Sequence, residues 1–522
     1  MACTSQPLAT AAALEVLRSG GNAVDAAVCA NAVLGVVEPG SCGMGGDLFA
    51  QVWWEKDRKL HGLNASGRAP YEWSITAAHG LGLARIPIFG PLSWSVPGCV
   101  SGWETLRARF GSRPLGDLLE PAVRYAEDGF PVSPVIARGW AAIDPGAHPT
   151  WAATFAPGGS SPRFGEIFKN PHLAHTLDLV KHKGKDAFYR GEIAGQIVQF
   201  SQKQGGRFTL RDFADHTDEW IEPVGSSYRG YDVWELPPPG QGIAVLQMLN
   251  ILSQFDVAAL APASAEHLHL LIEAKKLVYE DRARYYGDPE WSRVPVRELI
   301  SKEYAARRAK HIDLDRAAGE IHAGEFAVGP DTVYLATADR EGNMVSLIQS
   351  IYHGFGSREV PDGLGFALQN RGSGFALTPG HPNRLEPHKR PFHTIIPGFV
   401  TQNGEPKFAF GVMGGDFQPQ GQVQILLNSL DFNMSVQQAG EHPRVAHFNS
   451  STPEGDAAKG GGTVGLERGI SDSVRAELSA LGHAVKPGTD VFGGYQGIWR
   501  ESDPLRYFGG SDPRKDGCAL GY

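Results

Sequence analysis

The sequence predicts an α+β fold in which helices dominate the first two-thirds of the chain and strands dominate the last third. Apolar residues recur at helical spacing over residues 5–37, 265–284 and 296–310. After residue 330, short alternating segments are separated by Gly-Asn, Asn-Gly and Gly-Gly turns, a pattern typical of β-hairpins. Because the chain has no short-period repeat and no low-complexity linker, we expect a single interlocked body.

The first 54 residues predict two helices, a glycine-rich loop and a strand. Gly20-Gly21-Asn22 ends the first helix, and residues 23–36 form an alanine-rich second helix suited to close packing against a neighbour. The glycine-rich residues 40–46 lead into the strand, residues 48–54. Phosphate-binding loops run from a strand into a helix, whereas this loop runs from a helix into a strand. We therefore interpret it as a turn that needs positive φ.

The middle third is mostly helical, and residues 265–284 and 296–310 are its clearest helices. We interpret the charged stretch of residues 279–282 as a solvated helix face. His267 and His269 are two residues apart, so they point to different faces of a helix and do not form a metal-binding pair.

The last third is predicted to consist of strands interrupted by helices over residues 420–430 and 471–481. One expected strand covers residues 344–352. Because side chains alternate along a strand, Ser350 and Tyr352 would share one of its faces.

The composition argues against nucleic-acid and membrane partners. With a formal net charge of −9 over 522 residues, the chain has no excess of positive charge for nucleic acid or an anionic membrane. No apolar run approaches the about 18 residues that a membrane span needs, and no charged, then apolar leader precedes the first helix. We therefore expect a cytoplasmic protein.

The cysteines predict neither disulfides nor a metal site. Their spacing forms no disulfide framework and no Cys-x-x-Cys motif, so they are interpreted as small buried apolar side chains. The sequence predicts no metal and no other cofactor. The five cysteines are Cys3, Cys29, Cys42, Cys99 and Cys518.

A threonine at the change from helices to strands is a candidate nucleophile. Asp331-Thr332 precedes an alternating run of strand type. If the bond between these residues were cut, the new α-amine of Thr332 could act as the base for its own hydroxyl. Taken alone, the pattern also fits an ordinary threonine at the start of a strand.

Two glycine-bearing segments and one cationic segment of the last third could support this chemistry. Gly414 and Gly415 end a strand before a helix and could direct two backbone N–H groups at a developing oxyanion. Arg371 lies on a Gly/Ser-rich loop and suits a carboxylate. Residues 389–394 add positive charge. Each segment also fits a hairpin turn or a surface cation.

The chain resembles the γ-glutamyltransferase family of N-terminal nucleophile hydrolases over nearly its whole length. The combination and order of the similar segments make the resemblance specific. These segments are residues 5–9, 20–27, 37–39, 43–46, 237–243, 287–289 and 510–517.

This resemblance implies a four-layer αββα sandwich and autocleavage before Thr332. The products would be a large subunit of residues 1–331 and a small subunit of residues 332–522 that starts with the nucleophile. Ser350 falls where the family carries a second threonine, and the resemblance gives it a role in positioning the Thr332 amine. Gly414 and Gly415 would form the oxyanion site.

The substrate-recognition residues of the family are altered here, although the catalytic residues are retained. Arg68 lies two residues after Ser66, which stands where the family has the arginine for the substrate α-carboxylate. At the other altered positions, Tyr352 stands where the family has an asparagine, and Arg371 stands where it has an amide side chain. Gly374 stands where the family has the acid that pairs with the substrate α-amino group. His393 and Thr394 stand where the family has two serines.

These changes favour a small-molecule amide whose acyl group carries a carboxylate, such as a dicarboxylic monoamide or a glutaryl amide. Arg371 would bind the carboxylate, whereas a buried substrate ammonium would lose its partner at Gly374, at a cost of several kcal/mol. The expected substrate-binding residues are Arg371, Tyr352, His393, Thr394 and Arg68.

Two other functions stay open from the sequence. One is a genuine γ-glutamyltransferase or glutathione hydrolase, in which the ammonium partner comes from another loop. The other is a catalytically silent binding protein. A homo-oligomer of the expected heterodimers is compatible with all three functions.

Overall fold

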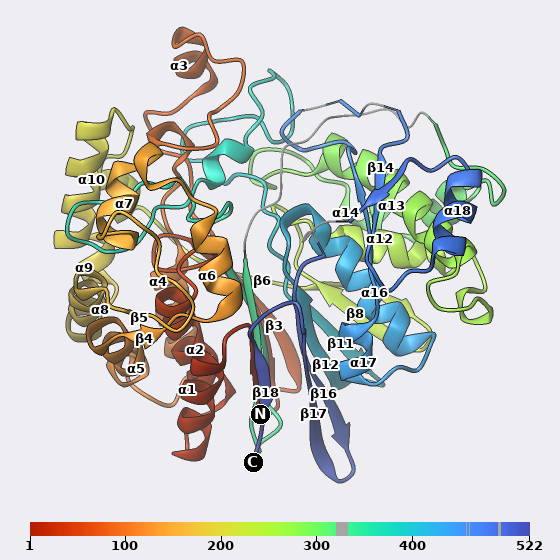
Figure 1. Ribbon diagram of the computed structural model, residues 1–522, viewed down its shortest axis with the longest axis horizontal. Helices are drawn as coiled ribbons and strands as arrows, with labels where there is room; N and C mark the ends of the chain where they lie inside the picture. The colour runs from red at the N-terminus through yellow and green to blue at the C-terminus, as the bar shows by residue number, and fades with distance from the viewer. Residues whose placement is uncertain (320–331, 456, 459, 489–491) are drawn as a thin grey trace.

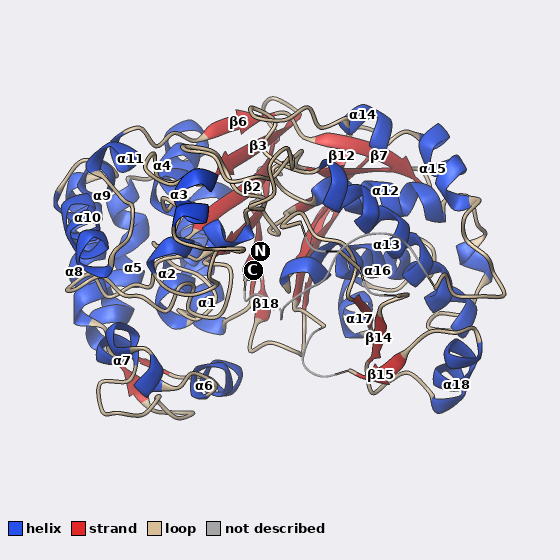
Figure 2. Cartoon of the chain, turned by 90° about the horizontal axis from the view of Figure 1, so that it is seen from above, coloured by secondary structure: helices blue, strands red, loops and turns tan. Residues whose placement is uncertain are grey.

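Two large β-sheets lie face to face between two layers of helices, which is the αββα sandwich that the resemblance implied (Figure 1). Seen from above, helices cover both outer sides of the strands (Figure 2). The computed structural model describes residues 1–319, 332–455, 457–458, 460–488 and 492–522. Asp331, on one side of the expected cleavage site, therefore lies outside the described residues.

The first sheet has seven strands in the order β18-β1-β9-β10-β2-β3-β6. Their bounds are β1 Ala2–Thr4, β2 Asp47–Trp54, β3 Lys59–Ala65, β6 Glu219–Ile221, β9 Val333–Ala338, β10 Met344–Ser350 and β18 Cys518–Leu520. Strand β10 pairs antiparallel with both β9 and β2, and its register sets Gln349 opposite Val333 and Ser350 opposite Asp47. The end of β10 is thus held between the starts of β9 and β2.

The second sheet has six strands in the order β17-β16-β12-β11-β8-β7. Their bounds are β7 Val224–Tyr228, β8 Tyr231–Glu235, β11 Gly398–Gln402, β12 Glu405–Val412, β16 Tyr495–Ser502 and β17 Leu505–Ser511. Residues before 320 and residues after 331 contribute strands to both large sheets. Neither part of the chain completes a sheet without the other.

Helices of the first layer pack on the first sheet through α2 and α4. This layer contains α1 Pro7–Arg18, α2 Ala23–Val37, α4 Cys99–Phe110, α5 Leu115–Asp128, α8 Pro171–Lys183 and α10 Glu192–Gln204. Asn22 and Asp25 form a capping box at the start of α2. A Cβ at Gly35 would lie 3.0 Å from the Cα of Gly43, so the small residues of α2 allow the glycine-rich loop to approach it closely.

Helices of the second layer pack on the second sheet through α12 and α16. This layer contains α12 Gly242–Leu252, α13 Ala265–Tyr285, α16 Gln418–Leu430, α17 Val436–Glu441 and α18 Asp472–Ala480. Between the two sheets, side chains from both of them form a separate apolar core that includes Phe49, Tyr334, Ile348, Phe399 and Ile498.

Shorter elements complete the described chain. The helices are α3 Ile75–Gly80, α6 Pro134–Ala141, α7 Pro149–Phe155, α9 Asp186–Tyr189, α11 Leu210–Ala214, α14 Val296–Leu299 and α15 Lys302–Ala309. The 3-10 turns are η1 Pro91–Ser93, η2 Pro145–Ala147, η3 Val257–Ala259, η4 Arg371–Gly374 and η5 Gly415–Phe417. The remaining strands are β4 Phe130–Pro131, β5 Ile167–Phe168, β13 Val445–Phe448, β14 Thr463–Leu466 and β15 Val485–Pro487.

Two expected elements differ from the structure. The helix over residues 296–310 is broken into α14 and α15, because Ser301 has extended backbone and caps α15 by accepting a hydrogen bond from the Tyr304 amide. The strand over residues 344–352 ends at Ser350, since Tyr352 has φ +81°. The prediction that Ser350 and Tyr352 share a strand face is therefore wrong.

Two other expectations are confirmed, the turn after α2 and the burial of most cysteines. The loop after α2 is a turn with positive φ at Gly43. All five cysteines are free thiols, of which four are buried and Cys518 is half-buried. Across the described segments, none of the helices is both long and apolar enough to cross a membrane.

Candidate active site

Thr332 and Ser350 meet at the edge where β9 begins and β10 ends. The Thr332 hydroxyl donates a hydrogen bond to Ser350 Oγ over 3.3 Å, and both residues are buried. The antiparallel pairing of β9 and β10 causes this contact between residues 18 positions apart. A Cβ at Gly46 would lie 2.3 Å from the Ser350 carbonyl oxygen, so the glycine-rich loop closes tightly over the same point.

Tyr352 connects Ser350 to Arg371. Its amide donates a hydrogen bond to Ser350 Oγ over 2.8 Å. The centre of the Tyr352 ring lies 3.9 Å from the Arg371 guanidinium carbon, which is a cation–π contact. Burial raises the pKa of Tyr352 well above its usual range, so the phenol stays protonated at neutral pH. The positive φ of Tyr352 turns its ring out of the β10 register and over Arg371.

Arg371 is a fully buried cation with two unpaired nitrogens. Its Nη1 donates a hydrogen bond to Thr394 Oγ1 over 2.8 Å. Its Nε and Nη2 have no hydrogen-bond partner, and no carboxylate in the described part of the chain lies within 4.0 Å of it. Burial lowers the pKa of Arg371 to about 10, so the group remains charged at neutral pH. Buried unpaired N–H donors are costly, and an anion would satisfy them.

The two glycines of the expected oxyanion site lie just after β12. Gly414 has φ +120° and Gly415 has φ +54°, conformations that favour glycine. Within the described residues, neither amide N–H has a protein acceptor. The preceding Gly411 packs directly on the Tyr334 ring, because a Cβ there would lie 2.4 Å from it. The glycine loop therefore leaves β12 beside the start of β9, where Thr332 lies.

Gln241 and Arg282 hold this loop in place, and the sequence did not assign them a role. Gln241 Nε2 donates to the carbonyl oxygens of Thr394 and Gly415, both over 2.8 Å. Arg282 Nη1 donates to Gln241 Oε1 over 2.6 Å and to Asp416 Oδ1 over 2.5 Å. Since Arg282 is completely buried, the interpretation of residues 279–282 as a solvated face is wrong.

His393 faces a buried carboxylate that sequence analysis missed. Its Nε2 lies 3.5 Å from Asp47 Oδ2, and neither side chain is exposed. Burial raises the pKa of Asp47 to about 6, and burial together with the nearby Arg371 charge lowers the pKa of His393 well below its usual range. Asp47 also accepts hydrogen bonds from the amides of Gly67 and Gly98. The imidazole is therefore neutral near pH 7.

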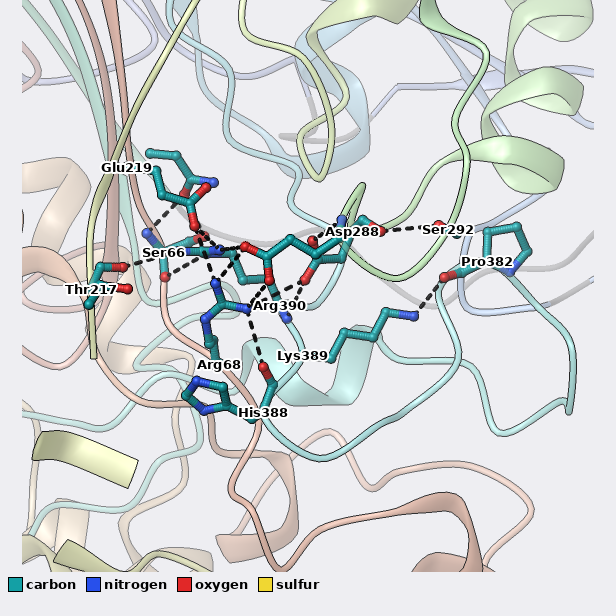
Figure 3. Close-up of polar contacts among 12 residues, drawn as sticks. Ser66, Arg68, Thr217, Glu219, Asp288, Ser292, Pro382, His388, Lys389 and Arg390 are labelled. Atoms are coloured by element: carbon teal, nitrogen blue, oxygen red, sulfur yellow. Dashed lines mark hydrogen bonds and ion pairs between the residues drawn. The ribbon is translucent and has the colours of Figure 1, made fainter. Parts of the chain in front are cut away.

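The structure does not bring Arg68 together with the other expected substrate-binding residues. Its two terminal nitrogens each lie 2.9 Å from a Glu290 oxygen. Nη2 also lies 3.2 Å from Glu219 (Figure 3). Arg390 joins the same carboxylates, with Nη1 2.6 Å from Glu219. The charge of Arg68 is therefore already matched by protein carboxylates.

An acidic side chain lies next to the position where the expected acid is missing. A Cβ at Gly374 would lie 3.7 Å from Glu454 Oε1. The other oxygen, Glu454 Oε2, is buried without a hydrogen-bond partner. Sequence analysis could not find this residue, because Glu454 is 80 positions from Gly374 in a loop without a recognisable motif.

A group of side chains that could hold a metal ion lies elsewhere, between α13 and the residues around His483. His269, Glu273 and His483 are buried, with ligand atoms within 4.8 Å of one another. Both nitrogens of His269 already contact protein atoms, His483 Nε2 and the Asp313 carbonyl oxygen, over 2.8 Å each. The Lys276 ammonium lies 2.7 Å from Glu273. These contacts link α13 to the chain around His483, where His483 Nδ1 is buried without a hydrogen-bond partner.

Comparisons with known proteins cover nearly the whole chain. The family described as gamma-glutamyltranspeptidase matches residues 9–522. The glutathione hydrolase-like YwrD proenzyme of Bacillus subtilis (strain 168) is 37% identical over 523 residues, which cover 98% of this chain and 97% of that protein. The acylase ACY 1 proenzyme of Pseudomonas sp. (strain SE83) is 34% identical over 516 residues, covering 95% and 89% respectively.

A solved structure, that of cephalosporin acylase from Bacillus halodurans, superposes with a TM-score of 0.92 at 41% sequence identity. The match covers 100% of this chain and 96% of that one. Sequence and fold therefore point to the same group of proteins.

Proposed function

We propose that this chain, which belongs to the γ-glutamyltranspeptidase family of N-terminal nucleophile hydrolases, matures by cleavage between Asp331 and Thr332. The products would be a large subunit of residues 1–331 and a small subunit of residues 332–522. The mature enzyme then acts as an acylase that hydrolyses amides with a carboxylate-bearing acyl group. The buried and partly unpaired guanidinium of Arg371 is the observation that carries this proposal.

The reaction starts at the freed amine of Thr332. An α-amine has a pKa of about 7.7–8.0, so near neutral pH a useful fraction can accept the proton of the Thr332 hydroxyl. Oγ1 then bonds to the carbonyl carbon of the amide, and the N–H groups of Gly414 and Gly415 stabilise the oxyanion. Ser350, in contact with Oγ1, orients the nucleophile.

The acyl-enzyme forms when the amide C–N bond breaks. The Thr332 ammonium returns its proton to the leaving amine, and the acyl group stays on Oγ1 as an ester. Water, deprotonated by the same amine, adds to the ester carbonyl and releases the acid together with free Thr332. An amine that replaces water would instead give a new amide.

Arg371 selects the acyl group by charge. A carboxylate on the acyl chain would accept hydrogen bonds from Nε and Nη2, the two nitrogens that lack partners. The family arginine position is occupied by Ser66, and Arg68 is paired with Glu290, so Arg371 is the cation available to a substrate near Thr332.

A second candidate function is transfer of γ-glutamyl groups to water or amines, and the position of Glu454 beside Gly374 favours it. Acceleration by glycylglycine would distinguish transfer from hydrolysis. The cytoplasmic location and a homo-oligomer of heterodimers stay predictions of the sequence.

Maturation is tested on a denaturing gel. We expect the 56.2 kDa chain to give two bands, whereas Thr332→Ala should remain a single band and lose amide hydrolysis by a factor of at least about 10³. A wild-type protein that stays uncleaved but active would overturn the assignment of Thr332.

The acyl preference is tested with matched p-nitroanilides. The glutaryl compound and the butyryl compound differ only by the terminal carboxylate. We expect kcat/KM to be at least about 10²-fold higher for glutaryl, because an unpaired buried Arg371 gains a partner only with that substrate. Equal rates for the two compounds would contradict the proposed role of Arg371.

A further inference from the structure

A buried pair of a carboxylate and an imidazole lies next to Ser350 in the first sheet. The register of β2 and β10 sets Asp47 directly opposite Ser350, and residues paired across antiparallel strands project their side chains on the same face. Because Ser350 also contacts the hydroxyl of Thr332, the three residues lie in one row at the ends of neighbouring strands. His393 extends this row, with Nε2 3.5 Å from Asp47 Oδ2.

The pair has hydrogen-bonding capacity that the protein does not use. One carboxylate oxygen, Asp47 Oδ1, accepts hydrogen bonds from the amides of Gly67 and Gly98 over 2.9 and 3.0 Å. The other oxygen and both ring nitrogens of His393 have no hydrogen-bond partner among the described residues. Both side chains are completely buried, and buried polar atoms without partners are costly unless a ligand satisfies them.

Arg371 couples the pair to the acyl-binding residues. It donates a hydrogen bond to Thr394, the residue that follows His393. Burial raises the pKa of Asp47 to about 6 and lowers the pKa of His393 well below its usual range, and the charge of Arg371 lowers both values. In the free site at pH 7, Asp47 is therefore ionised and His393 is neutral.

A carboxylate that binds to Arg371 removes this effect of the arginine. Once the guanidinium charge is neutralised, both members of the pair hold a proton more strongly, and the substrate charge adds to the shift because like charges disfavour each other in a buried site. The other groups that face the pair are Arg390 near His393, and Cys99 and Tyr189 near Asp47. Burial raises the pKa of this cysteine and this tyrosine, so both stay protonated.

We propose that Asp47 and His393 take up one proton from solvent when the carboxylate of an acyl group binds to Arg371. The proton makes His393 an imidazolium, whose Nε2–H faces Asp47 and whose Nδ1–H donates to the substrate carboxylate. The pair thereby adds a second donor for that carboxylate and makes its recognition depend on pH. This role rests on the acylase chemistry proposed at Thr332.

Calorimetric titration of the mature enzyme with glutarate tests the proton uptake directly. Binding enthalpies measured at pH 7 in phosphate and in Tris, which differ in ionisation enthalpy, give the number of protons taken up per glutarate. We expect about 0.5–1 proton for the wild type and fewer than about 0.2 for Asp47→Asn, whose amide oxygen still accepts the two backbone hydrogen bonds.

Glu280→Gln is the matched control for the loss of a buried carboxylate with a raised pKa. Burial raises the pKa of Glu280 to about 7, but this carboxylate accepts a hydrogen bond from Ser451 and lies outside the row of Asp47 and His393. Glu280→Gln should take up as many protons per glutarate as the wild type.

A kinetic measurement tests the same inference without a variant. Between pH 6 and pH 8, the ratio of kcat/KM for glutaryl-p-nitroanilide over butyryl-p-nitroanilide should fall about tenfold in the wild type. The reason is that carboxylate binding needs a proton, which the free site no longer holds above the pKa of Asp47. Titration of the Thr332 amine affects both substrates and cancels in the ratio. In Asp47→Asn the ratio should be independent of pH.

Failure of this inference differs from failure of the acylase proposal. Glutarate binding without proton uptake, or equal uptake in the wild type and Asp47→Asn, overturns the role of the pair while glutaryl hydrolysis continues. If glutarate binds too weakly for calorimetry, a wild-type ratio that does not change with pH overturns it. If the two anilides are cleaved equally at every pH, the acylase proposal fails and the inference fails with it.

Discussion

Two groups of buried arginines differ in how completely their charges are paired. Arg68 and Arg390 share Glu219 and Glu290 at ion-pair distance, and Arg390 also donates to two backbone carbonyl oxygens. Arg371 is equally buried but has one hydrogen bond and two unpaired nitrogens. The charges of the first group are matched by protein carboxylates, whereas Arg371 keeps unused hydrogen-bonding capacity, which we propose serves a ligand. Burial alone therefore does not distinguish an arginine with a matched charge from one that could bind an anion.

The largest expected effect comes from removing the unpaired arginine. Arg371→Gln should lower kcat/KM for glutaryl-p-nitroanilide by about 10²–10³-fold, because the substrate carboxylate loses its partner in a buried site. Hydrolysis of the butyryl compound should change little, and the denaturation midpoint should stay the same or rise, since an unpaired buried charge is removed. An equal loss on both anilides would instead place Arg371 among the structural arginines.

Removing a paired arginine should affect stability more than specificity. Arg390→Gln leaves Glu219 and Glu290 with fewer partners, and we expect the free energy of unfolding in urea to fall by about 2 kcal/mol. The value is modest because both glutamates reach solvent. The glutaryl-to-butyryl ratio of the folded enzyme should remain within about threefold of wild type. If the glutaryl-to-butyryl ratio fell far below that of the wild type in a stably folded Arg390→Gln protein, Arg390 would also contribute to specificity, and the distinction between the two groups of arginines would be wrong.

The smallest expected effect is the pH dependence of the paired group. Hydrogen bonding to Arg68, with the charges of Arg68 and Arg390, lowers the pKa of Glu290 to about 2 despite opposing burial. A carboxyl group whose pKa is lowered by folding stabilises the protein above its unfolded pKa of about 4.5. That stabilisation disappears as the pH falls from about 4.5 towards 2. Since Glu290 is half exposed, solvent screening keeps it below about 1 kcal/mol.

Unfolding of the wild type and Glu290→Gln at several pH values checks this prediction. The difference between their free energies of unfolding should shrink as the pH falls through this range. A difference that stays constant from pH 6 to pH 2.5 would show that the Glu290 charge contributes nothing to stability.

Local sequence patterns predicted much of the fold. The helices expected over residues 23–36 and 265–284 correspond to α2 and α13 almost residue for residue. Nearly all residues of both helices are buried, so runs of helix-forming residues after the N-caps Asn22 and Ser264, rather than a single apolar face, account for the agreement. The break at Ser301 and the end of β10 at Ser350 were missed. Both depend on single backbone conformations that apolar periodicity does not report.

The candidate site was predicted unevenly. Thr332, Gly414 and Gly415 were singled out by their local patterns and Ser350 by the family resemblance, and the structure places Thr332 against Ser350. Asp47, Gln241, Arg282 and Glu454 were not predicted as site residues. Each acts through a partner far along the chain, such as Gln241 with Gly415, 174 positions away. Contacts of this kind arise only when the sheets and loops come together.

By itself, the sequence determined the order of helices and strands, the position of the candidate nucleophile and the chemistry that a freed threonine amine can perform. These properties depend on residues close together in the chain. Only the tertiary structure decided which charges are paired, matching Arg68 with Glu290 while leaving two nitrogens of Arg371 and Oε2 of Glu454 without hydrogen-bond partners. The physical reason is that pairing of buried charges depends on distances of a few ångströms between side chains from distant segments.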